Sequence, residues 1–354
     1  MPRTRLVVLF GGRSAEHEVS CISARHVLAA IDPGRYDIVP IGITRQGTWV
    51  DAAGAVAALP SDAATLPSPD GLPGPGLDPF SVVAGAAGLV VFPLLHGPMG
   101  EDGTVQGLLE VAGVPYVGAG VLASSLCMDK GAANDVLTAR GLPQPRWRCR
   151  RDTELTEEAA AALIDDLGLP LFVKPANMGS SVGVSRADSA AELVAALATA
   201  CRYDEFVVVE EGLSHPREIE VAVLGNAEPR ASVPGEVVPS HDFYDFDDKY
   251  LAGNAGLRIP ADLKPDETAE AQALALSAYR ALRVDGMARV DLFHEADGRG
   301  FLVNEVNTIP GFTEISMYPR LWEASGLSYP RLIDELVRLA VERHDHRSSF
   351  ATTR

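Results

Sequence analysis

Two short stretches near the C-terminal end decide how the rest of the chain is understood: Gly286-Met-Ala-Arg-Val-Asp-Leu-Phe293 and Phe301-Leu-Val-Asn-Glu-Val-Asn307. Each is rich in apolar residues and has the length of one strand. Asp297 and Gly298 lie between them, and this pair is typical of a tight turn. The sequence therefore predicts a β-hairpin over residues 286–307.

The turn also sets the register of this hairpin. A short turn centred on Gly298 pairs Asp291 with Glu305 and Arg289 with Asn307. Side chains alternate between the two faces of a strand, so these four polar groups are expected on one face. The other face is then expected to carry four apolar residues: Val290, Leu292, Leu302 and Val306.

The polar face of the hairpin has the chemistry of a magnesium site. The carboxylates of Asp291 and Glu305 and the amide carbonyl of Asn307 are hard oxygen ligands, which suit Mg²⁺ bound together with nucleotide phosphates rather than zinc or calcium. The alternative is a solvated acidic face without a ligand, which is the common role of a single carboxylate pair. The neighbouring cation Arg289 and the irregular segment 308–311 favour the metal site.

The composition limits the kinds of ligand and partner. A chain of 354 residues with 47% hydrophobic and 22% charged residues is globular and long enough for roughly two or three domains. Its net charge of −18 argues against nucleic acid and against an anionic membrane surface, because the summed field attracts neither. An anionic ligand must therefore be held by local cations or by a metal ion.

The cysteines indicate a cytoplasmic protein. The four cysteines are Cys21, Cys127, Cys149 and Cys201. They lack the paired spacing of a zinc site or a disulfide framework, so reduced thiols are expected. The apolar run 6–10 has the length of a strand and is too short for an export signal or a membrane span. His344 and His346 lie in a polar tail that is predicted to be frayed and not to bind metal.

The first third of the chain alternates short apolar runs with amphipathic stretches. The predicted elements are strands at 6–10, 38–43 and 89–95 and helices at 18–31 and 103–111. This alternation is typical of a parallel sheet covered on both faces. The stretch 58–79, rich in Pro, Gly, Ser and Asp, is predicted to be a surface insertion without a packed core of its own.

Two further units follow. The first starts near residue 121, and its predicted elements are helices at 126–140, 157–167 and 190–200 and strands at 146–149 and 171–175. The second follows a strand at 206–210, and its predicted elements are a strand at 218–224, a loop-rich segment at 239–260, a helix at 267–282, the hairpin, and helices at 319–324 and 329–342.

One glycine-rich turn, Gly118-Ala-Gly120, resembles a dinucleotide-binding fingerprint. The strand before it is very short, and no acidic residue ends a second strand about twenty residues later, where the ribose of a dinucleotide is bound. A tight turn into a helix is therefore the favoured interpretation. An NAD enzyme is kept as an alternative that rests on these two glycines alone.

A second glycine-rich segment follows Lys174, which ends an apolar strand, and contains small residues between Gly179 and Gly183. Small side chains let backbone N–H groups approach phosphate oxygens, and the lysine supplies a positive charge. The segment lacks the P-loop pattern, and a plain glycine-rich hairpin turn is the alternative. The magnesium-type hairpin later in the chain favours phosphate binding.

Several motifs in a fixed order make the chain resemble the ATP-grasp ligases, and most closely the D-alanine–D-alanine ligases. The resemblance runs from about residue 7 to about residue 342, and the segments that carry it are GGRSAEHEVS (11–20), HGPMGEDG (96–103), MDK (128–130), VKP (173–175), GSSVG (179–183), FYDFDDKY (243–250), RVD (289–291) and NEVNTIPG (304–311). It implies an α/β and α+β ATP-grasp fold with three domains. These are an N-terminal Rossmann-like substrate domain (1–120), a central domain with the glycine-rich loop (121–209), and a C-terminal domain with a lid loop and the magnesium hairpin (210–354).

The resemblance also implies how ATP is bound. Its phosphates would lie against lysines and the glycine-rich loop, and its adenine and ribose would lie between the central and C-terminal domains. The residues implied at this site are Lys130, Lys174, Gly179, Ser180, Ser181, Val182, Glu210, Glu211, Leu213, Glu218, Lys249, Asn304 and Glu305. The family often has a lysine at the position of Glu211, and Arg217 is an extra residue before Glu218.

Metal binding and oxyanion stabilisation are implied at the hairpin. Asp291, Glu305 and Asn307 would bind two Mg²⁺ ions, with Mn²⁺ as an expected substitute. Arg289 and the backbone N–H of Gly311 would stabilise the oxyanion of the transition state, a role that electrostatics alone also predicts.

The resemblance implies two amino-acid subsites. Glu16 would pair with the ammonium of the first D-alanine, and His96 would lie close to that substrate. Lys249, Ser316 and the backbone of Met317 would bind the carboxylate of the second D-alanine. Without the resemblance, Glu16 at a helix start would be assigned to the helix dipole and His96 to hydrogen-bonded structure.

Tyr250 is implied in a lid loop over residues 242–251. Its hydroxyl would link to Glu16 and Ser180 and would help to exclude water from an acylphosphate. The related D-alanine–D-lactate ligases carry a histidine at this position, and an imidazolium would repel an incoming ammonium but not a hydroxyl group. The neutral tyrosine therefore predicts D-alanine as the second substrate.

The implied function is ATP-dependent ligation of two D-alanines through D-alanyl phosphate, for peptidoglycan precursors, by a cytoplasmic homodimer. One alternative is an ATP-grasp ligase for another carboxylate and amine, because the nucleotide and metal residues specify activation and not the acceptor. The other is a nucleotide-responsive binding protein without turnover, which leaves the pair Arg289 and Gly311 unexplained.

Overall fold

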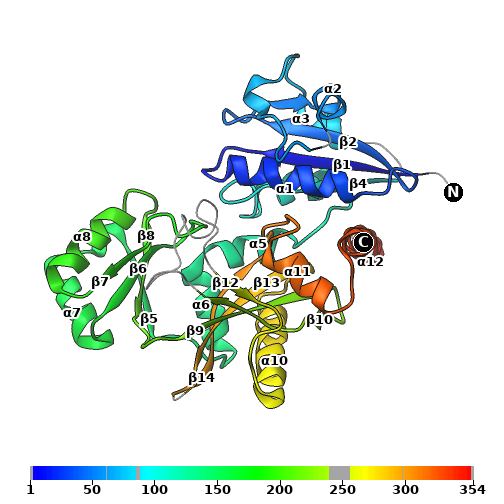
Figure 1. The fold of residues 1–354 in the computed structure, drawn as a ribbon. Helices are drawn as coiled ribbons and strands as arrows, with labels where there is room; N and C mark the ends of the chain where they lie inside the picture. Colours follow the sequence, from blue (N-terminus) through cyan, green and yellow to red (C-terminus); the bar gives the residue numbers. More distant parts are fainter. Residues whose placement is uncertain (1–2, 61, 85–87, 239–255, 297, 352–354) are drawn as a thin grey trace.

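The computed structural model describes residues 3–60, 62–84, 88–238, 256–296 and 298–351. In this part of the chain three β-sheets with helices packed against them form the molecule. Figure 1 shows the N-terminal unit in blue, the central unit in green beside it, and the C-terminal unit in yellow to red. This architecture confirms the expected mixture of α/β and α+β structure, whereas the domain boundaries at 120 and 209 stay predictions.

The N-terminal sheet is four-stranded, in the order β3-β2-β1-β4. The elements of this unit are β1 (Thr4–Gly11), α1 (His17–Ala30), β2 (Tyr36–Ile43), β3 (Trp49–Asp51), α2 (Ala53–Ala57), η1 (Pro69–Gly71), α3 (Pro79–Val83), β4 (Leu89–Pro93) and α4 (Thr104–Ala112). β1 pairs in parallel with β2 and β4, as predicted, and its apolar run from Leu6 to Phe10 is fully buried, as in sheets covered on both faces. The sheet also contains a short antiparallel edge strand, β3, which was not predicted.

The stretch 58–79 is packed into the N-terminal unit more closely than the prediction of a surface insertion implies. Leu66 is buried in the core beneath β1 and α1, and Ser68 Oγ lies 3.0 Å from His17 Nε2. Asp70 accepts a hydrogen bond from the Arg45 guanidinium at 2.6 Å. The stretch therefore completes the core of the N-terminal unit.

The central sheet is four-stranded, in the order β5-β8-β6-β7. Its elements are β5 (Trp147–Arg151), η2 (Asp152–Glu154), α7 (Glu157–Leu167), β6 (Leu171–Pro175), β7 (Ser185–Ala187), α8 (Ala190–Ala200) and β8 (Phe206–Glu211). The predicted bounds of α7, β6 and α8 are confirmed to the residue. The two helices start where predicted because Thr156 and Ser189 cap them through side-chain oxygens.

The single helix predicted over 126–140 is wrong. The structure has two helices, α5 (Val121–Met128) and α6 (Lys130–Ala139). Asp129 between them has an extended backbone and accepts a hydrogen bond from the backbone N–H of Ala132, which makes it the N-cap of α6. Lys130 is consequently the first residue of α6.

The C-terminal sheet is six-stranded, in the order β12-β11-β9-β13-β14, with β10 beside β9. The elements of this unit are β9 (Arg217–Gly225), β10 (Arg230–Ala231), β11 (Gly235–Val238), β12 (Gly256–Arg258), α10 (Pro265–Ala281), β13 (Gly286–Glu295), β14 (Gly300–Asn307), α11 (Met317–Ala324) and α12 (Tyr329–Ser348). α10 covers one face of this sheet, and α12 lies between the sheet and the N-terminal unit (Figure 1). Within the described ranges no helix combines the length and the apolar character needed to cross a membrane.

A β-bulge changes the outer part of the β13–β14 hairpin. It pairs Leu292 with Val303, so Val303 takes the place on the buried apolar face that was predicted for Leu302, and that prediction is wrong. A bulge adds one residue to one strand of a pair. Asn304 and Glu305 consequently both line the cleft described below.

The C-terminal tail is helical, so the prediction that it frays is wrong. α12 continues to Ser348. Arg343 is buried and donates hydrogen bonds to the backbone carbonyls of Tyr116 and Gly118. Its guanidinium lies 4.3 Å from the centre of the Tyr116 ring. These long-range contacts hold the tail against the N-terminal unit.

Candidate active site

A cleft of about 710 Å³ lies between the central and C-terminal sheets. One wall contains β6, β8 and the glycine-rich loop, and the other contains β9, β13 and β14. The residues predicted to bind ATP that line it are Lys130, Lys174, Gly179, Ser180, Ser181, Glu210, Glu211, Leu213, Glu218, Asn304 and Glu305. Asp291 and Arg289 line it as well. Residues from several distant segments therefore meet at one cleft.

The hairpin places the predicted metal ligands together. Asp291 lies opposite Glu305 and Arg289 opposite Asn307, which confirms the predicted register. Arg289 donates to both oxygens of Asp291, at 2.7 and 2.6 Å, and lies 3.0 Å from Glu220. The Asn307 amide donates to Asp291 at 2.9 Å. Burial alone would lower the pKa of Arg289, but the two carboxylates outweigh it and raise this pKa well above its usual value.

Two lysines bring positive charge to the same cleft. Lys174 Nζ lies 2.7 Å from Glu210 and donates to Asn304 Oδ1 at 3.3 Å. Burial alone would lower the pKa of Lys174, but the adjacent Glu210 outweighs it and raises this pKa. Lys130 Nζ lies 3.8 Å from Glu305. Two ammonium groups that contact the hairpin, one at Glu305 and one at Asn304, are suited to phosphate oxygens.

The glycine-rich loop is strained and closely packed. Ser180 and Ser181 have φ of 51° and 59°, in the left-handed region that is uncommon for residues other than glycine. The Ser180 hydroxyl donates a hydrogen bond to Glu16. A Cβ at Gly179 would lie 3.1 Å from Glu16 Oε2, so a glycine allows this approach. Val182 donates from its backbone N–H to Gly179 at 3.1 Å and closes the turn.

Two acidic residues near the site, Glu101 and Glu220, were not assigned a role from the sequence. Glu101 accepts a hydrogen bond from the backbone N–H of Gly97 at 2.8 Å, and burial followed by the nearby Glu16 raises its pKa to about 8. Its signal was its place within a motif that carries the family resemblance. Glu220 lies two residues after Glu218 on β9, so strand alternation could have predicted that both face the cleft.

His96 is buried with both ring nitrogens hydrogen-bonded. Nδ1 lies 3.0 Å from the carbonyl oxygen of Ile309 and must donate, because a carbonyl only accepts. Nε2 therefore accepts from the Ser23 hydroxyl at 3.3 Å. Burial lowers the pKa of His96, which keeps the ring neutral. The side chain thus holds the Ile309 segment to the N-terminal unit, and its contact with the first substrate stays a prediction.

Two of the three residues predicted at the second amino-acid subsite, Ser316 and Met317, lie at the start of α11. Ser316 accepts a hydrogen bond from the backbone N–H of Thr313 at 3.0 Å, and a Cβ at Gly311 would lie 3.1 Å from Ser316 Oγ. Met317 is the first residue of the helix. A helix N-terminus carries partial positive charge, which favours a carboxylate. Lys249 and Tyr250 lie outside the described residues.

The acidic ligands fit a divalent ion that is bound together with phosphates. In the described part of the chain no group of three or more His, Cys, Asp or Glu side chains could hold a metal ion by itself. Mg²⁺ usually takes one or two carboxylates and completes its shell with substrate phosphates and water. Asp291 and Glu305 fit that pattern, because both line the cleft that also contains the lysines, whereas Asn307 does not line it and contacts Asp291 through its amide.

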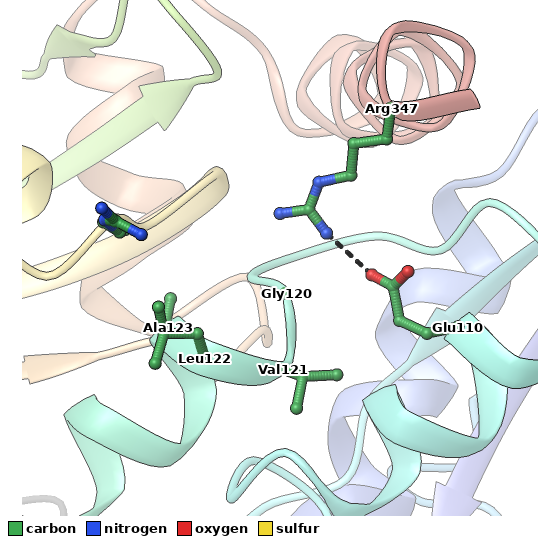
Figure 2. A pocket seen from close by; sticks show the side chains of 7 residues that line it. Glu110, Gly120, Val121, Leu122, Ala123 and Arg347 are labelled. Atoms are coloured by element: carbon green, nitrogen blue, oxygen red, sulfur yellow. Dashed lines mark hydrogen bonds and ion pairs between the residues drawn. The ribbon is translucent and has the colours of Figure 1, made fainter. Parts of the chain in front are cut away.

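The other glycine-rich turn lies at a smaller hollow of about 410 Å³. Figure 2 shows Gly120 beside Arg347 and Glu110, which form an ion pair at 2.8 Å. A Cβ at Gly120 would lie 3.0 Å from Arg347. Close packing at Gly120 and the left-handed backbone of Gly118, with φ of 94°, therefore account for both glycines of this turn without a dinucleotide.

Two sheets around a nucleotide-sized cleft, with lysines on one side and an acidic hairpin on the other, form the site of an ATP-grasp enzyme. Two family models match the chain, "D-ala D-ala ligase N-terminus" over residues 5–119 and "D-ala D-ala ligase C-terminus" over residues 136–338. The chain therefore belongs to the D-alanine–D-alanine ligase family.

Individual relatives are similar over nearly the whole chain. The D-alanine–D-alanine ligase of Deinococcus radiodurans is 47% identical, with 96% of this chain and 99% of that protein covered. The one from Thermoanaerobacter sp. (strain X514) is 45% identical, with 98% and 99% covered. The structure of the D-alanine–D-alanine ligase from Coxiella burnetii gives a TM-score of 0.84 at 37% identity, with 98% and 97% covered. That of the VanG D-Ala:D-Ser ligase from Enterococcus faecalis gives 0.82 at 36%, with 96% and 100% covered.

Proposed function

We propose that the protein joins two D-alanine molecules to D-alanyl-D-alanine with release of ADP and phosphate, for peptidoglycan precursor synthesis. The observation that carries this proposal is the cleft in which Lys130 and Lys174 lie near the acidic hairpin. A free carboxylate is a poor acyl donor, so it must first accept the γ-phosphoryl group of ATP to become an acylphosphate. The amine of the second D-alanine then attacks the activated carbonyl and expels phosphate.

The residues at the cleft have different roles in this reaction. Lys130 and Lys174 hold the ATP phosphates in line with the attacking carboxylate. Glu16, fixed by the hydrogen bond from Ser180, pairs with the ammonium of the first D-alanine. Arg289, positively charged and partly buried, stabilises the oxyanion formed when the amine attacks.

The remaining roles follow from the hairpin and from α11. The Gly311 N–H assists Arg289 at the oxyanion, and the helix start at Ser316 and Met317, with Lys249, binds the carboxylate of the second D-alanine. A divalent metal held by Asp291, Glu305 and Asn307 would offset the charge of the phosphates and the developing transition state. Two Mg²⁺ ions, replaceable by Mn²⁺, are part of this proposal.

Cellular location and assembly are further parts of the proposal. The use of ATP supports a cytoplasmic reaction, as do the free thiols of the four cysteines, all of which lie in the described part of the chain. The homodimer is proposed from the family alone. Size-exclusion chromatography with light scattering measures it directly.

A single assay tests the proposed reaction. The protein is incubated with ATP, Mg²⁺ and one amino acid at a time, namely D-alanine, L-alanine or D-serine, and nucleotide and amide products are identified. D-Alanine should give ADP, phosphate and D-alanyl-D-alanine in equal amounts. AMP with pyrophosphate, or ATP hydrolysis without an amide, would contradict the proposal. D-Serine is included because one of the similar structures, that of VanG from Enterococcus faecalis, is a D-Ala:D-Ser ligase.

A further inference from the structure

The side chain of Glu211 connects the two walls of the nucleotide cleft. Glu211 is the last residue of β8, on the central wall. One of its oxygens lies 3.0 Å from Arg146 Nε, and the other accepts from the backbone N–H of Arg146 at 2.7 Å. Arg299, in the turn of the β13–β14 hairpin on the opposite wall, donates to the same carboxylate at 2.6 Å.

Each arginine is also fixed within its own unit. Arg146 donates to the carbonyl oxygens of Asp166 and Leu167, at 2.8 and 2.7 Å, at the C-terminal end of α7. Arg299 donates to Glu295 of β13 at 2.8 Å. One carboxylate is therefore held by an anchored cation from each wall. Arg146 orients Glu211 within the central wall, and a change in the separation of the walls must stretch or break the bond between Arg299 and Glu211.

The environment keeps this carboxylate charged. Burial alone would raise the pKa of Glu211, but the hydrogen bonds from Arg146 and Arg299 outweigh it and lower this pKa. The Glu211 side chain is only 14% exposed, whereas those of Arg146 and Arg299 are 54% and 44% exposed. A set of charge-assisted bonds to a shielded carboxylate is stronger than an isolated surface ion pair.

We propose that Glu211, Arg146 and Arg299 form a clamp that sets the separation of the two walls of the ATP cleft. Glu211 is then a positioning residue for the nucleotide, and its side chain is not an adenine ligand. This inference rests on the proposed use of ATP.

The expected effect of the clamp is on affinity. A nucleotide that contacts both walls binds only when their separation fits it, and the apparent affinity falls with the fraction of molecules that have this separation. The backbone N–H of Val303 on β14 also donates to Pro143, before β5, at 2.8 Å. The two units thus join at this edge, and the ion pairs set how far apart the walls lie.

The test compares Arg299→Gln, Arg146→Gln and Glu211→Gln with the unmodified protein. The control is Arg338→Gln, which breaks ion pairs of the same kind with Glu335 and Glu342 on the surface of α12. The dissociation constant for MgADP is measured by titration calorimetry, the KM for ATP and kcat by steady-state kinetics, and the melting temperature by calorimetry.

The three clamp variants should each weaken MgADP binding and raise the KM for ATP by about three- to tenfold, with kcat changed less than about twofold. The double variant Glu211→Gln/Arg299→Gln should lose no more MgADP affinity than the more affected single variant, because both substitutions remove the same connection. Arg299→Lys should recover part of the loss. Arg338→Gln should leave all three constants unchanged.

The opposite results would overturn the clamp. These are unchanged MgADP affinity in the folded variants, additive losses in the double variant, or a lower melting temperature without a change in KM. MgADP binding does not require ligation, so the clamp can be supported even if no dipeptide forms and the proposed reaction fails. Failure of the unmodified protein to bind MgADP would overturn both.

Discussion

Ser180 in the glycine-rich loop donates a hydrogen bond to Glu16 before α1, a residue 164 positions earlier in the chain. This bond joins the wall of the nucleotide cleft to the N-terminal unit. The proposed phosphate site and the proposed ammonium site are therefore parts of one connected structure. A change in the loop is expected to reach the first D-alanine as well as ATP.

Ser180→Ala should lower kcat/KM for D-alanine by about ten- to a hundredfold, the range of a lost hydrogen bond to a charged group. Ser189→Ala, which removes the N-cap of α8 in the same unit, is the matched control. It should lower the free energy of unfolding by about 1 kcal/mol without changing the kinetic constants. Steady-state kinetics and denaturant unfolding of both variants measure this. Equal kinetic losses in the two variants would show that the Ser180 bond has no specific role.

Glu305→Gln keeps the size of the side chain and removes its charge. Turnover should fall by at least about a hundredfold while the fold is retained, because a metal-borne electrostatic contribution is lost. Glu323→Gln on α11 is the control for loss of one acidic charge. Rates are measured across Mg²⁺ concentrations with circular dichroism as the check on folding. Near-normal turnover at saturating Mg²⁺ would identify Glu305 as a solvated sheet residue.

Glu101 should make the stability of the protein depend on pH. Its pKa is about 8 in the folded protein against an ordinary value of 4.5, so the folded state holds this proton more tightly than the unfolded state. The resulting stabilisation is complete below about pH 4.5, decreases as the pH rises, and is gone above about pH 8.

The comparison with Glu101→Gln isolates this effect. The free energy of unfolding of the unmodified protein, relative to this variant, should fall by about 1–2 kcal/mol between pH 5 and pH 8.5, less than the full shift implies because Glu101 is partly exposed. Denaturant unfolding at several pH values measures it. A constant difference across this range would mean that Glu101 titrates normally.

The acceptor preference is predicted to depend on Tyr250. The unmodified protein should form the D-alanyl-D-alanine amide in mixtures of D-alanine and D-lactate, because a neutral phenol does not repel the incoming ammonium. Tyr250→His should shift part of the product to the ester at low pH, where the imidazole is protonated. Product analysis from pH 6 to pH 9 tests this. Substantial ester from the unmodified protein near neutral pH would be inconsistent with it.

Local patterns determined much of the architecture. The turn at Gly298 predicted the pairing of Asp291 with Glu305, and the starts of α7 and α8 follow from N-caps within the same few residues. Lys130, Lys174 and the glycine-rich loop could be assigned to phosphate binding because their sequence motifs resemble those of a known family. These features depend on neighbours in the sequence, or on motifs that keep a fixed order.

Tertiary structure alone decided the features that depend on residues far apart in the chain. The bulge that replaces Leu302 by Val303, the helical tail held by Arg343, the raised pKa of Glu101 and the place of Glu211 between two arginines had no local signal. Each is set by burial or by charges from other units, which act through space at a few ångströms. The sequence determined which groups carry the proposed chemistry, and packing between distant segments decided which of them touch and in what state of charge.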